Sequence, residues 1–324
     1  MKTKWIDFYG KRFIYFVITG VIMLAGIVAM FVNGVQLDIQ FKGGAIIKYL
    51  SATTLDVEKA ENVAEQTLNR QVQGQISKDL LSGEDRLVLN LAGNAGLDAA
   101  DQDKLDAALK EAFPEAKLTL SDSSVVQPFF GRKFLTNGIL AIALAAATIV
   151  VYVWFRFRRI HGLSAGVMAL VALLHDLLVV FFTCVVAKIP LGDSFVAIAL
   201  TIIGYSINDT IVIYDRIREN ARLDRHMPAD ELVNKSVTQS LGRSINTNAA
   251  VFVSILMVYI FAMAGSIESI INFALPMTIG TISGCYSTVC IAGPLWAMWQ
   301  MRRKPNNHHP AKKPAKAQPK LKKA

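Results

Sequence analysis

The sequence has few cysteines, and none lies where a disulfide would form outside a cell. All three cysteines fall within apolar segments, at Cys184, Cys285 and Cys290. Disulfides persist in oxidising compartments, so a hydrophilic stretch without cysteine must hold its fold by packing alone. That stretch, residues 34–133, also lacks histidine. The absence of both residue types excludes a Cys/His metal site and a thiol–imidazole nucleophile there.

Charged residues are scarce over long parts of the chain. Hydrophobic residues make up 53% of its 324 residues, and the mean hydropathy is +0.39. Such a composition is typical of a polytopic membrane protein. Six segments have the roughly 20 mostly apolar residues that a transmembrane helix needs: 13–32, 135–155, 163–186, 194–214, 245–264 and 270–298.

The first apolar segment has two interpretations. Basic residues precede it, as they precede the apolar core of a signal peptide. The segment is nevertheless long, and no small-x-small cleavage site follows it. We therefore interpret it as an uncleaved membrane anchor.

The basic residues alternate between the two sides of the predicted helices. Arginines fill the second and fourth connections and follow the last helix, whereas the third connection has only Lys188 and the fifth has no basic residue. The positive-inside rule then places both termini in the cytoplasm. The net charge of +9 follows from this topology and from a basic tail, and it predicts no specific nucleic-acid partner. The predicted parts are a cytoplasmic N-terminus with the first helix (1–33), a periplasmic domain (34–133), a five-helix bundle (134–300) and a disordered basic cytoplasmic tail (301–324).

The periplasmic segment alternates between strand and helix patterns. Period-2 and period-3.6 spacing of apolar residues predicts strands at 45–50, 72–76, 86–91 and 117–121, and helices at 55–68 and 98–113. The order βαββαβ is the ferredoxin-like arrangement. The predicted fold is therefore a six-helix membrane protein with one α+β ferredoxin-like domain between helices 1 and 2. The carboxylates of this domain are interpreted first as a solvated face. The alternative is a module that binds extended polypeptide at a sheet edge, next to strand 45–50 or strand 117–121.

One carboxylate interrupts the fourth apolar segment. Burying Asp209 unpaired at that depth would cost about 2.5 to 3.5 kcal/mol on insertion scales. Asn208 precedes it and Ser206 lies three residues earlier. Three polar side chains within four residues indicate a lined site, and an intramembrane carboxylate commonly marks an ion or proton path.

Arg243 is the predicted partner of Asp209. If helices 4 and 5 form an antiparallel hairpin that turns near position 226, the two residues lie at the same depth. The alternative is that Arg243 ends the cytoplasmic side of helix 5 and reaches to the headgroups. The polar run from Arg243 to Asn248 favours a helix that faces the interior of the bundle.

Two further features fall within apolar segments. His175 and Asp176 interrupt the third segment, where the pair is either a proton relay or a structural link between helices. Gly280 and Gly284 form a GxxxG motif that would allow close helix approach, and Pro276 is expected to kink the sixth segment.

Four stretches resemble one known family. The run 204–220 (GYSINDTIVIYDRIREN) closely resembles the fourth-helix signature of SecF subunits, within the SecD/SecF family and the wider RND superfamily. Further matches are 37–44 (LDIQFKGG), His175-Asp176 and 240–247 (SLGRSINT). They occur in the family's order and spacing over about residues 10–300. The family usually has threonine where this chain has Lys42, which puts the contacts of that loop in question.

The resemblance implies a function in protein export. Members use the proton-motive force with SecD, beside the SecYEG channel, to move unfolded secretory polypeptide across the inner membrane; YajC and YidC are further candidate partners. The role is not enzymatic and implies no cofactor or metal. The family's intramembrane aspartate and arginine match Asp209 and Arg243, so the expected proton-coupling set is Asp209, Arg243, Asn208 and Ser206, with His175 and Asp176 as secondary candidates. Gly43 and Gly44 match the family motif after helix 1.

Two other functions compete with this one. An RND-type exporter of small molecules usually has twelve membrane segments and two large external domains, which this chain lacks. A scaffold or insertase subunit that stabilises the translocon without using energy is the second alternative, in which Asp209 and Arg243 would be a structural pair only.

Overall fold

The structure is a computed structural model that describes residues 5–38, 44–53, 55–78, 85–92, 97–126, 128–265 and 267–303. Six spans in it are long and apolar enough to cross a membrane, which confirms the predicted number. Five are single helices: α1 (Arg12–Asn33), α5 (Pro128–Arg156), α6 (Gly162–Val186), α7 (Asp193–Leu223) and α8 (Ala229–Ala264). The sixth joins α9 (Glu268–Ser287), a π-helical turn η3 (Thr288–Ala292) and α10 (Gly293–Arg303). The protein is therefore a multi-pass membrane protein.

Several helices extend well beyond their apolar segments. Helix α7 continues through the arginines after Tyr214, and α8 begins at Ala229 although its apolar part begins near Ile245. The apolar window marks only the part of a helix that would lie in hydrocarbon. The polar extensions pair with one another instead: Asn220 on α7 donates to Ser236 on α8 over 2.9 Å.

Three spans form the centre of the bundle. Helices α6, α7 and the α9–α10 span are each buried along half or more of their apolar length, whereas α1, α5 and α8 are mostly exposed. The exposed side chains of α1 and α5 are predominantly apolar, among them Val21, Phe31 and Trp154, as a lipid-facing surface requires. Polar groups on α6, α7 and α9 can thus be shielded from lipid.

The sheet domain lies between α1 and α5 in the chain. Its elements are β1 (Gly44–Ser51), α3 (Val57–Leu68), β2 (Val72–Lys78), β3 (Asp85–Ala92), α4 (Ala99–Ala112) and β4 (Thr119–Val126). The four strands pair antiparallel in the order β2-β3-β1-β4. Strand β1 is therefore central, and the prediction of a free edge beside 45–50 was wrong. It failed because both sides of β1 pair, with β3 and with β4, which leaves the edges to β2 and β4.

The last strand begins later than predicted. A short 3₁₀ turn at Pro114–Ala116 ends at Lys117, whose φ of 45° is incompatible with a strand. Strand β4 consequently starts at Thr119 and continues to Val126.

The two faces of the sheet differ. Alternate residues of β1, including Ile47 and Tyr49, are fully buried in a core with Leu105 and Leu109 of α4. The opposite face carries no described helix of the domain and combines polar residues such as Gln73 with apolar ones such as Ile46 and Val88. Because side chains alternate along a strand, the residues between the core positions point to this second face, which is polar at β2.

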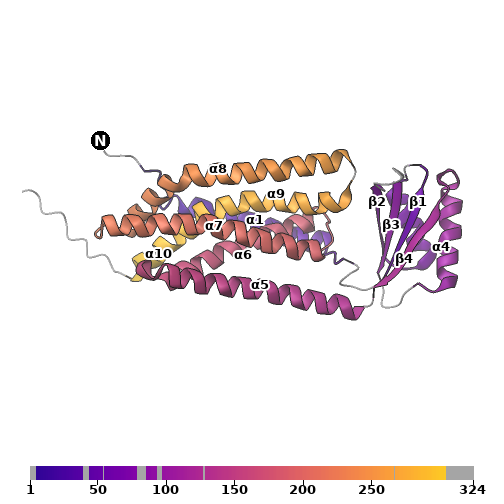
Figure 1. The fold of residues 1–324 in the computed structure, drawn as a ribbon, viewed down its shortest axis with the longest axis horizontal. Helices are drawn as coiled ribbons and strands as arrows, with labels where there is room; N and C mark the ends of the chain where they lie inside the picture. The colour runs from indigo at the N-terminus through magenta and orange to yellow at the C-terminus, as the bar shows by residue number, and fades with distance from the viewer. Residues whose placement is uncertain are drawn as a thin grey trace, which may run out of the picture.

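The sheet domain lies beyond one end of the helical bundle (Figure 1). The start of α1 and the end of α10 lie at the opposite end. After α1 the chain runs extended, and Leu37 pairs in parallel with Leu191 in the connection between α6 and α7. Asp38 donates its N–H to the Leu191 carbonyl over 3.0 Å, and Leu191 donates to the Gln36 carbonyl over 2.9 Å. The linker is thus attached to the bundle.

Candidate functional site: buried carboxyl groups in the helical bundle

Asp176 of α6 joins three helices at the centre of the bundle. Its side chain is fully buried. Three serine hydroxyls donate to its two oxygens, from Ser206 on α7 over 2.6 Å and from Ser283 and Ser287 on α9 over 2.7 Å each. Hydrogen bonds to the ionised form stabilise a buried carboxylate. The serine hydroxyls therefore supply most of the hydrogen bonds that water would otherwise donate to the carboxyl group of Asp176.

His175 completes this cluster. Its Nδ1 lies 3.1 Å from Oδ1 of Asp176 and 3.5 Å from the hydroxyl of Ser283. Its Nε2 is buried without a hydrogen-bond partner among the described residues, and its ring centroid lies 5.9 Å from that of Tyr286. An imidazole beside a carboxylate can pass a proton by exchanging one between the two groups. The geometry is compatible with a relay and with a structural pair.

Glycines and the π-helical turn bring α9 close to α7. A Cβ at Gly284 would lie 3.3 Å from Cβ of Ser206, and one at Gly280 would lie 2.7 Å from Cδ1 of Ile202. The GxxxG motif therefore faces α7 at close range. At the start of the turn, the Thr288 hydroxyl lies 3.1 Å from that of Thr210. π-helical turns are frequent at functional sites, and this one lies directly after Ser287.

Asp209 forms a second buried carboxyl site between α7 and α8. Asp209 is 6% exposed and accepts a hydrogen bond from the side-chain amide of Asn248. The same amide donates to the carbonyl of Ser244 over 2.9 Å. Side chains on a helix lean toward its N-terminus, which is why the Asn248 amide reaches the carbonyl of Ser244, four residues earlier, as well as the Asp209 carboxylate.

The structure places the predicted proton-coupling residues in different surroundings. Among the described residues, no ion pair joins Arg243 to Asp209, although Arg243 lies close enough for the two charges to attract. Arg243 and Asn208 are both exposed on the outside of the bundle. Ser206 bonds to Asp176 rather than to Asp209. The sites thus contain Asp209 with Asn248, and Asp176 with His175 and Ser206.

Three residues of these sites are not predicted from the sequence. Asn248 is visible there only as the end of a polar run, and Ser283 and Ser287 carry no signal of their own. Serines are common in membrane helices, so only the helical spacing of Ser283 and Ser287 on one face could have indicated them. Gly44 is described, with φ 148° at the start of β1, whereas Gly43 and Lys42 lie outside the described residues. No cluster of metal-binding side chains occurs within the described ranges.

Fold and site together define a multi-pass helical membrane protein with two buried, hydrogen-bonded carboxyl groups in its central helices. The family model for "Protein export membrane protein SecD/SecF, C-terminal" matches residues 104–302. The chain is 35% identical to the protein translocase subunit SecF of Alicyclobacillus acidocaldarius, over 93% of this chain and 95% of the relative. The chain belongs to the SecD/SecF family of protein export membrane proteins.

Longer relatives share the same region. The chain is 32% identical to the protein translocase subunit SecDF of Bacillus subtilis, over 92% of this chain but 38% of the relative. A crystal structure of SecDF from Thermus thermophilus, described as a translocon-associated membrane protein, superposes with a TM-score of 0.74 at 26% identity. The match covers 92% of this chain and 39% of that structure. The chain thus spans about two fifths of these SecDF proteins.

Proposed function

We propose that the protein is an accessory subunit of the Sec protein-export machinery that uses the proton-motive force. In this proposal it works with a SecD partner to drive or complete polypeptide translocation across the inner membrane. The names of its relatives support the class of function, which is transport rather than catalysis. The observation that carries the proton-coupled mechanism is Asp209, a buried carboxyl group held by an amide inside an apolar span.

The environment of Asp209 suits reversible proton binding. Desolvation disfavours a buried carboxylate, whereas the Asn248 amide and the charge of Arg243 favour it. With these influences opposed, a moderate change in helix packing shifts the balance between the charged and neutral forms. Such a carboxyl group can load a proton from one side of the membrane and release it to the other.

The exposed polar residues support a membrane partner. Arg243 and Asn208 lie on the outside of apolar spans, where lipid would leave their hydrogen-bonding groups unsatisfied. A second membrane protein that covers this face would satisfy them. In the SecDF relatives the matching region is part of a longer chain, which favours SecD as that partner, with SecYEG, YajC and YidC as further members of the assembly.

The orientation and the domain fit the same proposal. Arg156 at the end of α5 and Arg218 near the end of α7 both bond to Asp215, and these two helices end on the side of the bundle away from the sheet (Figure 1). The positive-inside rule assigns that end to the cytoplasm and the sheet to the periplasm. The strand order β2-β3-β1-β4 with two helices on one face favours the ferredoxin-like assignment. We infer that this domain contacts unfolded secretory polypeptide after it leaves the channel.

Replacing Asp209 tests the proton-coupled mechanism. Asp209→Asn keeps the size of the side chain and can accept from Asn248, but it cannot exchange a proton. We expect the variant to insert and fold, and to lose the part of export that depends on the proton gradient. The measurement is secretion of a reporter protein with and without a protonophore. Asp193→Asn, at the exposed start of the same helix, is the matched control and should export as the parent does.

The same assay separates the alternatives. If Asp209→Asn kept its full response to the protonophore, the coupling role would be wrong and the scaffold function would be favoured. A small-molecule exporter would instead leave secretion unchanged and alter resistance to toxic compounds.

A further inference from the structure

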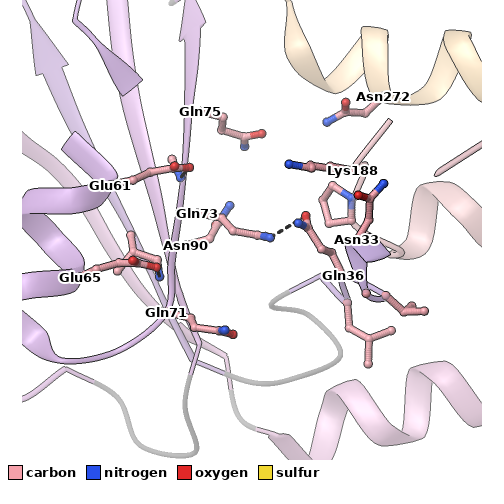
Figure 2. Close-up of a pocket in the computed structure, with 16 residues that line it drawn as sticks. Asn33, Gln36, Glu61, Glu65, Gln71, Gln73, Gln75, Asn90, Lys188 and Asn272 are labelled. Carbon is pink, nitrogen blue, oxygen red and sulfur yellow. Dashed lines mark hydrogen bonds between the residues drawn. The ribbon is translucent and has the colours of Figure 1, made fainter. Parts of the chain in front are cut away.

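A polar cavity of about 680 Å³ lies between the sheet domain and the helical bundle (Figure 2). Its sheet wall consists of Gln73, Gln75 and Asn90, which lie on the face of β2 and β3 that no helix of the domain covers. Its opposite wall includes Lys188 from the connection after α6 and Asn272 from α9. A volume in this range suits a ligand of a few residues.

The cavity is lined largely by side-chain amides without partners. Gln71, Gln75, Asn90 and Asn272 have no side-chain hydrogen bond among the described residues, and Figure 2 shows Gln75 and Asn272 pointing into the space. Each carboxamide offers donors and an acceptor side by side, as a peptide group does. Such a lining complements polypeptide backbone, whose N–H and C=O groups are the same whatever the side chains.

The rim of the cavity is the free edge of β2, and two carboxylates of α3 occupy two of its outward N–H donors. Glu65 accepts from the N–H of Val72 over 3.1 Å, and Glu61 accepts from the N–H of Gly74 over 2.6 Å. In an antiparallel strand the C=O of a residue points to the same side as its N–H. The outward carbonyls of Val72 and Gly74 therefore remain as acceptors, beside two negative charges. This edge favours ligands that donate hydrogen bonds and carry positive charge.

The cleft already contains one extended segment of the chain. Gln36 follows α1 in extended backbone, pairs with Leu191 through its carbonyl, and accepts from the side chain of Gln73 over 3.0 Å. A smaller cavity of about 130 Å³ shares Gln73, Gln75 and Asn272 and continues to apolar residues at the helix ends, including Phe195 and Ile198. The amide-lined space thus continues into a smaller pocket of mixed lining, which includes Asp38 and Ser194 beside these apolar groups and can take side chains.

We propose that this cavity binds a short extended segment of polypeptide along β2, with weak sequence preference and a bias toward basic residues. The inference rests on the proposed export function, and it names the site and the chemistry by which the domain holds its substrate. Peptide N–H groups donate to the carbonyls of Val72 and Gly74, and the amides of Gln75 and Asn272 pair with backbone on either side. Glu61 and Glu65 prevent full strand addition, which keeps the binding reversible.

Peptide binding to the full chain in detergent tests the inference directly. The probes are three fluorescein-labelled twelve-residue peptides of Gly, Ser, Thr and Ala: one neutral, one with two central lysines and one with two central glutamates. Binding is measured by fluorescence anisotropy. We expect the lysine peptide to bind about threefold more tightly than the neutral one, as for a solvent-exposed ion pair, and the glutamate peptide to bind most weakly.

Two pairs of variants locate the binding. Asn272→Trp fills the cavity from the bundle side and should weaken the binding of all three peptides at least tenfold, whereas Gln66→Trp, exposed elsewhere on α3, should not. Glu61→Gln still accepts from Gly74 and should reduce the preference for lysine while leaving the neutral peptide unaffected. Glu111→Gln, exposed on α4 and outside the cavity lining, should keep that preference.

Each outcome decides between the two proposals. The inference is overturned if the parent and Asn272→Trp bind the peptides equally, or if neither binds them. This holds even if export depends on Asp209, because that result tests only the proposed function. If Asn272→Trp loses peptide binding but still exports normally, the result supports the site and removes its role in export. Loss of both peptide binding and export in Asn272→Trp, with Gln66→Trp normal, supports both proposals.

Discussion

The hydroxyl of Ser206 on α7 donates a 2.6 Å hydrogen bond to Oδ2 of Asp176 on α6. Ser287 of α9 donates to the same oxygen over 2.7 Å. One carboxylate oxygen thus ties three helices together, next to a histidine. This bond also assigns Ser206 to the Asp176 cluster and leaves Asp209 with Asn248 as its partner.

Replacing the carboxyl group of Asp176 should loosen the bundle. Asp176→Asn replaces an acceptor oxygen by a donor that faces serine hydroxyls, and unmatched buried groups cost about 1–3 kcal/mol each. We expect a clear fall in the thermal unfolding midpoint in detergent. Ser206→Ala removes one of three serine donors and should cost about 1 kcal/mol. If Asp176→Asn unfolded at the parent temperature and lost export, the relay role would be favoured over the structural one.

The close approach of α9 to α7 should make Gly280 sensitive to substitution. A methyl group there would lie 2.7 Å from Ile202 and 2.8 Å from Val180, so both side chains must shift, at about 1–3 kcal/mol for an overpacked core. Gly280→Ala should lower the unfolding midpoint. Gly204→Ala is the matched control on α7, because nothing lies within 4 Å of its added methyl. Equal midpoints for the two variants would contradict this packing.

Tyr49 offers a stabilising substitution in the sheet domain. Its ring is fully buried in the core, and its hydroxyl has no hydrogen-bond partner among the described residues. Burial raises the pKa of this phenol well above its usual value, so the group stays neutral. Tyr49→Phe removes an unsatisfied polar atom and should stabilise the domain by about 1 kcal/mol. Hydrogen exchange of the amides in β1 and β3 measures the change, and faster exchange would refute it.

The ion pair between Lys48 and Asp122 should make the β1–β4 pairing weaker in acid. Lys48 donates to Asp122 over 2.9 Å across the two strands, and this hydrogen bond, with the lysine charge, lowers the pKa of the carboxyl group. A lowered pKa contributes stability above the unfolded-state value, about 3.9, and loses it as the pH falls through the folded-state value. Lys48→Met should return the pKa of Asp122 toward its ordinary value in a carboxyl NMR titration. An unchanged titration would exclude the ion pair in solution.

Arg243 is expected to resist even conservative replacement. Lysine keeps the charge but not the planar, multidentate donor geometry of the guanidinium group. If Arg243 meets a membrane partner, Arg243→Lys should reduce both export and co-purification with SecD. Arg222→Lys, in the exposed last turn of α7, should leave both unchanged. Normal co-purification of Arg243→Lys with poor export would place the role of Arg243 within this chain.

The sequence alone determined the elements of the fold. Apolar runs of about 20 residues identified all six spans, because the length of hydrocarbon to be crossed sets the length of the run. In the sheet domain, periodicity identified all four strands and both helices, since alternation and 3.6-residue spacing are local properties of the chain. The resemblance in residues 204–220 indicated the family for the same reason, as a contiguous motif is visible without a structure.

Only the tertiary structure decided which polar groups meet. Counting residues from a turn brings Asp209 near Arg243 but does not reveal Asn248, whose lean toward the start of α8 brings its amide to the carboxylate. Serines 283 and 287 reach Asp176 because glycines and a π-helical turn set how closely α9 approaches its neighbours. Likewise the pairing of β1 on both sides, which makes β2 an edge beside the polar cavity, depends on contacts between residues far apart in the chain. Local patterns determine which elements form, whereas side-chain direction and helix approach are fixed only when the elements pack.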